Sequence, residues 1–352
     1  MRTSITNLTS VSVFPFAAFA SLRLIAVFRM TLLVAILGCV PLPSHAAAPA
    51  GTFPQRPIRL IVGFTPGGAT DLVGRLVAEK LSERFAQQVV VDNRPGASGI
   101  VGARIVGDSQ PDGHTLLISG SSISIVGSLL KEARFDVQRD LQPLAMVATS
   151  PYILVAHPST GVKTVPELIA YAKPRAGKLS YGASTPGTVQ HLSAEMLKRL
   201  VGIDMLFVPY KGTGQMMPDL LGGRLQIVMD NILILSPHVK SGAVNALAVS
   251  TARRSPVLPN VPSLAESGVP ALKDFDTGGW FSMYVPLNTP APVVKILNGE
   301  ILAMLERPEV RERLLSFGAT PLPGTPDDLR AQLAREVPRW RKVIADAGIK
   351  GE

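Results

Sequence analysis

The feature that most constrains the fold of this chain is a regular alternation of strand-like and helix-like segments. Residues 58–64 form a short apolar run typical of a buried strand, and residues 72–81 carry apolar side chains at helical spacing after Thr70, the expected N-cap. Strand-like residues 89–91, helix-like residues 99–109 and strand-like residues 115–119 follow. Because strands separated by helices tend to pair in parallel, the pattern predicts an open α/β sheet.

The alternation continues along the chain, and its length of 352 residues favours two lobes over one core. Further strands are expected at residues 144–148, 152–156, 179–182, 205–208, 225–230, 245–250 and 280–285. Further helices are expected after a capping box at Thr164, ending near Lys173, and at residues 188–201, 214–222, 232–241, 291–306, 308–316 and 326–347. We therefore predict an α/β protein in which each lobe is an open sheet flanked by helices.

The composition is that of a globular protein, with 46% hydrophobic and 17% charged residues. The formal net charge of +9 is spread without any block of five or more Lys and Arg residues, and aromatic residues make up only 5%. A nucleic-acid groove needs clustered basic and stacking side chains, so we expect no nucleic-acid partner. Most of these charges are expected to solvate the surface, with a modest field that favours anions.

The N-terminal segment resembles an export leader. Residues 30–46 form an apolar run that ends in Ser44-His45-Ala46, a small-x-small pattern, so we predict a signal peptide at residues 1–46 with cleavage after Ala46. The run is short for a bilayer span. Lipidation at Cys39, the only cysteine, is a less favoured alternative. Cleavage at Ala46 would leave a mature chain without a disulfide.

Four loops that each follow a strand and precede a helix could hold an anion: residues 64–71, 182–188, 209–214 and 229–231. In the first, Gly67 and Gly68 let the backbone approach a ligand, and the following helix N-terminus supplies amide donors. Asp71 would repel an anion and is expected to charge the first helical turn instead. An ordinary tight turn explains this loop equally well.

The other three loops offer different chemistry. Ser184 and Thr188 could donate hydroxyl hydrogen bonds, although plain N-capping is the simpler explanation. Lys211 could pair with an anion, although such lysines are more often solvated. Asp230 follows an apolar strand, so it needs hydrogen-bond partners and could orient an amino or hydroxyl group of a ligand.

Enzyme motifs are absent: the sequence has no P-loop, no GxSxG, no HExxH and no GxGxxG. A hydrolase that uses Ser184, His191 and Asp230 remains a minor alternative, because nothing in their spacing requires a triad. His191 and Glu195 share a helix face, which is more typical of a surface pair than of a metal site. We expect a protein that is not an enzyme and that needs no cofactor and no metal.

The ordered series of loops resembles the Bug/TctC family of periplasmic receptors over residues 53–349. The matching pieces include Pro66-Gly67-Gly68 with Thr70-Asp71, residues 92–97 (DNRPGA) and Asp230-Asn231; the most specific is residues 208–214 (VPYKGTG). The resemblance implies a two-lobed periplasmic binding protein of type II. It also implies a small carboxylate ligand between the lobes, held mainly by backbone amides and ordered waters.

Carried over by position, the resemblance implies lobe 1 at residues 53–150 plus 276–352 and lobe 2 at residues 151–275. The implied ligand contacts are Phe64, Gly67, Gly68, Ala69, Thr70, Ser119 and Ser121 from lobe 1, and Ser184, Thr188, His191, Lys211 and Asp230 from lobe 2. This sequence departs from the family pattern at Ala69, where Gly or Ser is common, and at residues 120–124, which lack an Asn-Pro segment.

The resemblance also implies partners. The expected role is capture of a small carboxylate in the periplasm by a monomer, which then docks on the membrane permease subunits of a tripartite tricarboxylate-type transporter. A sensor that feeds a two-component kinase is an alternative from another class.

Overall fold

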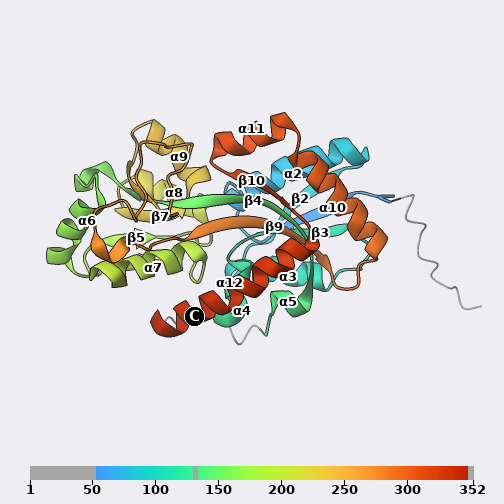
Figure 1. Cartoon of the computed structure of the whole chain (residues 1–352), viewed down its shortest axis with the longest axis horizontal. Helices are drawn as coiled ribbons and strands as arrows, with labels where there is room; N and C mark the ends of the chain where they lie inside the picture. The colour runs from blue at the N-terminus through green and yellow to red at the C-terminus, as the bar shows by residue number, and fades with distance from the viewer. Residues whose placement is uncertain (1–52, 130–133, 348–352) are drawn as a thin grey trace, which may run out of the picture. The chain divides into compact units, whose positions relative to one another are not determined.

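The computed structural model describes residues 53–129 and 134–347 (Figure 1). The predicted signal peptide at residues 1–46, its cleavage after Ala46 and the alternative lipidation at Cys39 lie outside the described residues. Within the described part of the chain, no helix has the length and apolar character needed to cross a bilayer.

The strands are β1 (Ile58–Val62), β2 (Val89–Asn93), β3 (Thr115–Gly120), β4 (Leu141–Ala156), β5 (Ser180–Gly182), β6 (Leu206–Val208), β7 (Ile227–Asn231), β8 (Asn245–Val249), β9 (Gly278–Pro286) and β10 (Thr320–Gly324). The α-helices are α2 (Ala69–Phe85), α3 (Ile100–Gly107), α4 (Ile123–Leu129), α5 (Val137–Asp140), α6 (Val165–Ala172), α7 (Val189–Val201), α8 (Thr213–Leu221), α9 (Ile232–Lys240), α10 (Ala291–Leu305), α11 (Pro308–Phe317) and α12 (Pro326–Ala347). Short 3-10 turns join several of them.

The strands form one hydrogen-bonded array in the order β2-β1-β3-β9-β4-β7-β5-β6, with β8 and β10 also paired to β4. β1 is parallel to β2 and β3, and β5 is parallel to β6 and β7, as the strand–helix alternation predicts. β9 and β4 run antiparallel to their neighbours and join the two parallel sets. Figure 1 shows β4 and β9 passing between the elements around α2 and those around α7.

β4 corrects the expectation of two separate strands at residues 144–148 and 152–156. It is continuous: it pairs with β9 as far as Pro151, then with β7 from Tyr152 and with β8 from Ile153. Pro151 lacks an N–H and so cannot donate to a strand ladder. Pro151 lies where β4 changes its pairing partner from β9 to β7, so the missing N–H does not interrupt the strand. The predicted lobe boundaries near residues 150 and 275 stay predictions.

Alternating side chains of β1 explain why helices cover both faces of the first parallel set. Leu60 packs in one buried cluster with Val73 of α2, whereas its neighbour Ile61 packs in another with Ala103 of α3. Successive side chains of a strand point to opposite faces, so α2 and α3 lie on opposite sides. The same holds for β7, where Val228 shares a cluster with α8 residues and Met229 shares one with α7 residues.

Three local expectations differ from the structure. The N-cap of α2 is Gly68, not Thr70, and no side chain caps it. β10 went unrecognised because its five residues include two prolines, which are tolerated in a strand paired only with β4. α4 also went unrecognised, since its β-branched residues resemble a strand. The helix start expected at Thr164 is confirmed: Glu167 N donates to Thr164 Oγ1 over 3.3 Å. The Glu167 carboxylate accepts from Lys163 N, one residue before the N-cap, and so does not complete the expected capping box.

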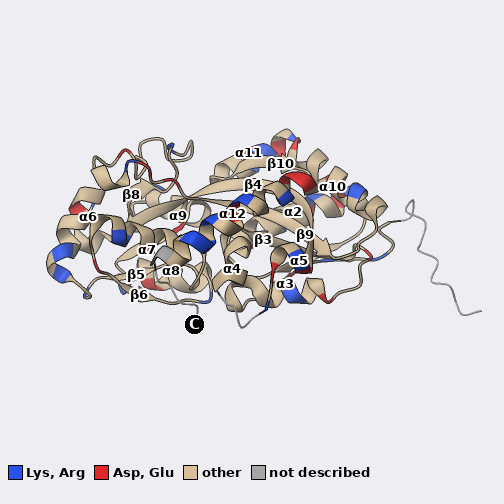
Figure 2. Ribbon diagram, turned by 60° about the horizontal axis from the view of Figure 1, so that its bottom comes forward, with Lys and Arg blue, Asp and Glu red and all other residues tan. Residues whose placement is uncertain are grey.

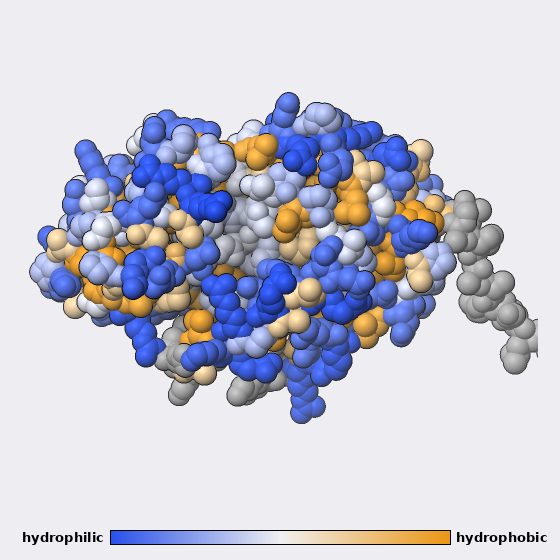
Figure 3. Space-filling model, in the orientation of Figure 1, coloured by the Kyte–Doolittle hydropathy of each residue, from blue (hydrophilic) through white to orange (hydrophobic). Residues whose placement is uncertain are grey.

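Charged residues of both signs are interspersed along the helices (Figure 2). The face drawn in Figure 3 is mainly hydrophilic, with smaller hydrophobic areas between the polar ones. Large exposed hydrophobic residues, such as Val90 and Leu206, come from separate elements. Single exposed residues of this kind are usual and carry no functional argument.

Candidate functional site

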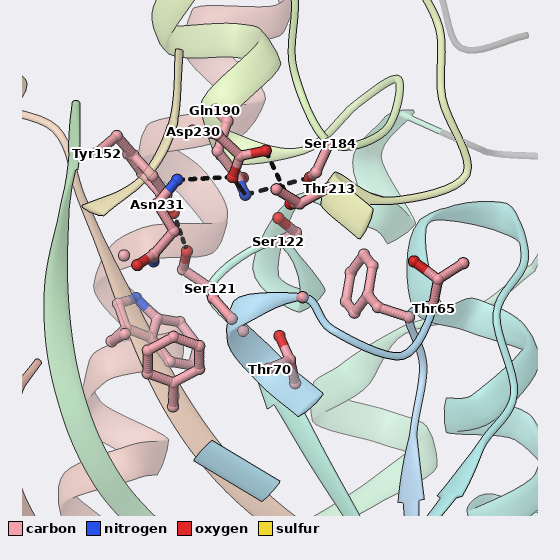
Figure 4. Close-up of a pocket in the computed structure, with 17 residues that line it drawn as sticks. Thr65, Thr70, Ser121, Ser122, Tyr152, Ser184, Gln190, Thr213, Asp230 and Asn231 are labelled. Carbon is pink, nitrogen blue, oxygen red and sulfur yellow. Dashed lines mark hydrogen bonds between the residues drawn. The ribbon is translucent and has the colours of Figure 1, made fainter. Parts of the chain in front are cut away.

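A buried polar cavity lies where strand ends meet helix N-termini (Figure 4). It is lined by Phe64, Thr65, Gly68, Ala69, Thr70, Gly120, Ser121, Ser122, Tyr152, Ser184, Gln190, Thr213, Asp230, Asn231, Gly279, Trp280 and Phe281. Its volume is about 40 Å³, enough for a few water molecules. In this arrangement it could enclose the head group of a small ligand.

The N-terminus of α2 opens into this cavity. Gly68 is the N-cap, with extended backbone (φ −84°, ψ 169°) and no side-chain hydrogen bond to the first turn. Gly68, Ala69 and Thr70 all line the cavity. The first amides of a helix have no partner within the helix and carry a partial positive charge. This end of α2 therefore offers backbone donors to an anion.

Asp71 holds the loop before α2 in place. Its carboxylate accepts hydrogen bonds from Gly67 N, Arg75 Nε and Asn93 Nδ2, each 2.9 Å long. Burial alone would raise the pKa of Asp71, but these donors outweigh it and the pKa lies below its usual value. Asp71 lies in the first turn, as expected. The amide of Gly67 is occupied by this contact, so it is not free for a ligand.

Asp230 lines the opposite part of the cavity at the end of β7 and is fully buried. Its Oδ2 accepts from Thr213 Oγ1 (2.8 Å), and its Oδ1 accepts from Asn231 N (2.6 Å) and Gln190 Nε2 (3.3 Å). Burial nevertheless raises the pKa of Asp230 to about 6. No Lys or Arg among the described residues forms an ion pair with it.

Three buried polar atoms of cavity residues have no hydrogen-bond partner in the protein: Thr65 Oγ1, Gln190 Oε1 and Trp280 Nε1. Leaving such an atom unpaired costs about 1–3 kcal/mol, so these atoms call for partners from outside the chain. Sequence reasoning missed Trp280 as a site residue. A buried tryptophan N–H usually finds an acceptor, but nothing in the sequence says that this one is buried without one.

A second, wider pocket of about 570 Å³ also touches Phe64. Lys211 and His191 line this second pocket and not the polar cavity. His191 is buried, its Nδ1 accepts from Gly187 N (3.1 Å), and its ring stacks on Phe207 with centroids 4.2 Å apart. Burial lowers the pKa of His191 to about 4, so the ring is neutral at physiological pH.

Loops from the two parallel sets touch one another beside the cavity and beside the wider pocket. Val189 N donates to Ser122 Oγ (3.2 Å), and Ser98 Oγ donates to Pro186 O (2.5 Å). A Cβ atom at Gly214 would lie 2.7 Å from Pro66 O. The glycine of this loop is therefore needed for close approach, which its sequence alone did not indicate.

The structure brings most of the predicted site residues to the cavity. Phe64, Gly68, Ala69, Thr70, Ser121, Ser184 and Asp230 line it. Gly67, Ser119 and Thr188 do not. Gly67 is bonded to Asp71, Ser119 lies within β3 opposite Ser282 of β9, and Thr188 caps α7 by accepting from His191 N. Their role, like that of every predicted ligand contact, stays a prediction.

The predicted catalytic alternatives find other partners. Ser184 Oγ accepts from Gln190 Nε2 (3.2 Å), while His191 Nδ1 is occupied by Gly187 N. Glu195, considered with His191 as a metal pair, accepts hydrogen bonds from Tyr181 OH and Lys198 Nζ. The described residues contain no group of three His, Cys, Asp or Glu side chains placed to hold a metal ion.

Two linked α/β halves around a polar cavity at strand ends define a two-lobed periplasmic binding protein. The chain belongs to the tripartite tricarboxylate transporter receptor family (TctC), whose family model matches residues 73–349. The family resemblance inferred from the loops is thus confirmed. Its members are binding proteins, not enzymes.

Individual relatives agree with this assignment. The chain is 37% identical to BugT of Bordetella pertussis over 92% of this chain and 99% of BugT. It is similar in structure to the periplasmic binding protein BugD, with a TM-score of 0.81 and 34% identity over 85% of this chain and all of BugD. It is equally similar to R. palustris Rpa4515, solved with adipate, with a TM-score of 0.81 and 37% identity over 85% of this chain and 99% of that protein.

Proposed function

We propose that this protein is an extracytoplasmic receptor that captures a small carboxylate between its two lobes for uptake by a tripartite tricarboxylate-type transporter. The observation that carries the proposal is the uncapped N-terminus of α2, which faces a buried cavity beside the unpaired Trp280 Nε1. Here lobe 1 is residues 53–150 plus 276–352, and lobe 2 is residues 151–275.

The physical basis is charge stabilisation by fixed dipoles. Backbone amides at a helix N-terminus, together with hydroxyl and indole donors, can satisfy carboxylate oxygens without a cationic side chain. Two basic residues in or just after the predicted loops, Lys211 and Arg75, do not line the cavity. Lys211 lines the wider pocket, and Arg75 binds Asp71. R. palustris Rpa4515 was solved with the dicarboxylate adipate, which supports this ligand class.

The contacts between the loops support capture by closure. Gly212 and Gly214 approach Thr65 and Pro66 across the cavity, and Val189 binds Ser122. A ligand that bridges both sides would favour this closed arrangement, because it interacts with it more strongly than with an open one. The closed monomer would then present a surface to permease subunits, after export directed by residues 1–46.

The proposal is tested by thermal shift and calorimetry with a panel of organic acids, since a ligand of the folded state raises its melting temperature. The matched variants are Ala69→Pro and Ala291→Pro, at the first positions of α2 and α10. Proline is tolerated at that position, where it removes one amide donor. We expect weaker carboxylate binding by Ala69→Pro only. Failure of every carboxylate to bind the wild type would overturn the proposal.

A further inference from the structure

We propose that the ligand carries a hydroxyl or ammonium group beside its carboxylate, and that Gln190 Oε1 accepts a hydrogen bond from that group. This inference rests on the proposed function. It concerns the side of the cavity formed by Gln190 and Asp230, whose hydrogen-bond acceptors would receive no donor from a ligand that carries only carboxylate groups.

The orientation of the Gln190 amide is set by its neighbours. Its Nε2 donates to Ser184 Oγ over 3.2 Å and to Asp230 Oδ1 over 3.3 Å. An ionised carboxylate can accept hydrogen bonds but cannot donate them. Rotating the Gln190 amide by half a turn would therefore place its Oε1 against Oδ1 of Asp230, two acceptors facing each other. Oε1 therefore points away from Asp230, and it is buried with no partner in the protein.

The cavity thus has two sides of opposite polarity. The end of α2 and Trp280 Nε1 supply donors, because an indole N–H can only donate. Asp230 and Gln190 supply acceptors. In Figure 4, Gln190 and Asp230 lie together with Ser184 and Thr213, while Thr70 lies on the far side of the drawn residues. A carboxylate matches the donor side only.

The acceptor side also lacks a compensating positive charge. Asp230 is fully buried, its partners are neutral donors, and the ion pairs of the described residues do not include it. A ligand hydroxyl would supply the missing donor, and an ammonium group would in addition neutralise this charge. The small volume, about 40 Å³, favours a donor close to the carboxylate.

The size of the effect follows from the cost of an unpaired buried acceptor. A ligand without the donor would leave Gln190 Oε1 dry and unsatisfied, which weakens binding by about 10- to 100-fold relative to a matched ligand that has the donor. Discrimination of this kind is strong where a site is built to hydrogen-bond a polar substituent.

The test is calorimetry on the wild-type protein with matched acids: succinate against malate and aspartate, propionate against lactate and alanine, and adipate. We expect at least about tenfold tighter binding of one substituted acid than of its unsubstituted parent. Malate and lactate report a hydroxyl, whereas aspartate and alanine report an ammonium group. These comparisons need no variant, so they do not depend on the folding of a mutant.

The variants then assign the effect to Gln190. Gln190→Met removes the acceptor at similar length and is expected to abolish the preference while carboxylates still bind. Gln138→Met, on the exposed surface, should keep the preference. Equal binding of substituted and unsubstituted acids, or a preference that survives in Gln190→Met, would overturn this inference and leave the receptor function intact. Binding of no acid at all would overturn both.

Discussion

Two buried titratable side chains near the cavity have pKa values shifted in opposite directions by the same cause. Burial raises the pKa of Asp230 to about 6 and lowers that of His191 to about 4, because a low-dielectric environment disfavours the charged form of each. Between pH 4 and pH 6 the two groups therefore have opposite effects on how stability changes with pH. As pH rises from 4 to 6, Asp230 lowers the stability of the native state, whereas His191 raises it.

The contribution of Asp230 can be isolated with Asp230→Asn in the ligand-free protein. The native state holds its proton up to about pH 6, whereas the usual value is 3.8, so between these values the native state binds more protons and stability falls as pH rises. The free energy of unfolding of the variant minus that of the wild type should rise by up to about 3 kcal/mol between pH 4 and pH 7. Denaturant unfolding at several pH values measures it. A flat difference would contradict the pKa shift.

Trp280 and Trp340 form a second contrast at the scale of single residues. Trp280 Nε1 is unpaired in the cavity, whereas Trp340 Nε1 donates to Glu336 Oε2 over 2.7 Å. These are the two tryptophans of the chain. A ligand carboxylate that accepts from Trp280 would change the surroundings of one indole and leave those of the other unchanged.

We therefore expect Trp280→Phe to weaken carboxylate binding about 10- to 100-fold, as for loss of a hydrogen bond to a charged group. Trp340→Phe is the matched control and should bind normally. Fluorescence titration should show a ligand response in Trp340→Phe, where Trp280 is the only indole. Persistence of that response in Trp280→Phe would show that the indole in the cavity is not the reporter.

At the scale of elements, the site depends on how the β1–α2 loop is anchored. Asp71 binds the Gly67 amide ahead of it, Arg75 one turn later and Asn93 at the end of β2. This clamp holds the N-terminal amides of α2 beside the cavity. Asp71 would repel an anion at close range, but its position behind the loop lets it support the proposed anion site indirectly, by holding these amides in place.

Asp71→Asn should break the clamp at modest structural cost. It removes the ion pair to Arg75 and one of the charge-assisted acceptors, so we expect a loss of about 1–3 kcal/mol in stability and weaker ligand binding. The pKa of Asp71 is lowered in the native state, so its contribution is present above the usual value of 3.8 and is lost as pH falls further. Unfolding at pH 7 and pH 3 should show a smaller gap from wild type at pH 3. An equal gap would argue against an ionised clamp.

At the scale of the whole described structure, loops that are far apart in sequence come into close contact, and the proposed ligand capture would depend on this contact. Gly214 lies against Pro66, and Gly212 lies against Thr65. Gly212 is the N-cap of α8 and Gly214 lies in its first turn, beside Lys211, which stays a predicted ligand contact. A side chain at either glycine would keep these loops apart, so the proposed closure requires both glycines.

Gly214→Ala should hinder this closure, since its Cβ would meet Pro66 O at 2.7 Å. Gly299→Ala is the matched control: it is also within a helix, and a Cβ there would meet nothing within 4 Å. We expect at least about tenfold weaker binding in Gly214→Ala and a smaller ligand-induced decrease in radius of gyration by small-angle scattering. Gly299→Ala should bind normally and gain about 0.5–1 kcal/mol of stability. Equal binding by both variants would contradict the role of closure.

Sequence reasoning located the loops of the site but not the atoms that face the cavity. Gly68, Ala69 and Asp230 were predicted, and they line it. Trp280 and Gln190 were not among the predicted site residues, although both line the cavity, because an unpaired buried atom is visible only once its neighbours are known. Gly67 was predicted but is bonded to Asp71, a partner that spacing alone could not assign.

The sequence by itself determined the α/β class, most of the helices and the family, because periodicity and short loop motifs are properties of neighbouring residues. Tertiary structure decided the rest. Pairing with β9 and then β7 made β4 one strand across Pro151, and packing made α4 a helix despite its β-branched residues. It also decided which polar atoms remain unpaired around Asp230, because burial and partner choice depend on residues distant in the chain.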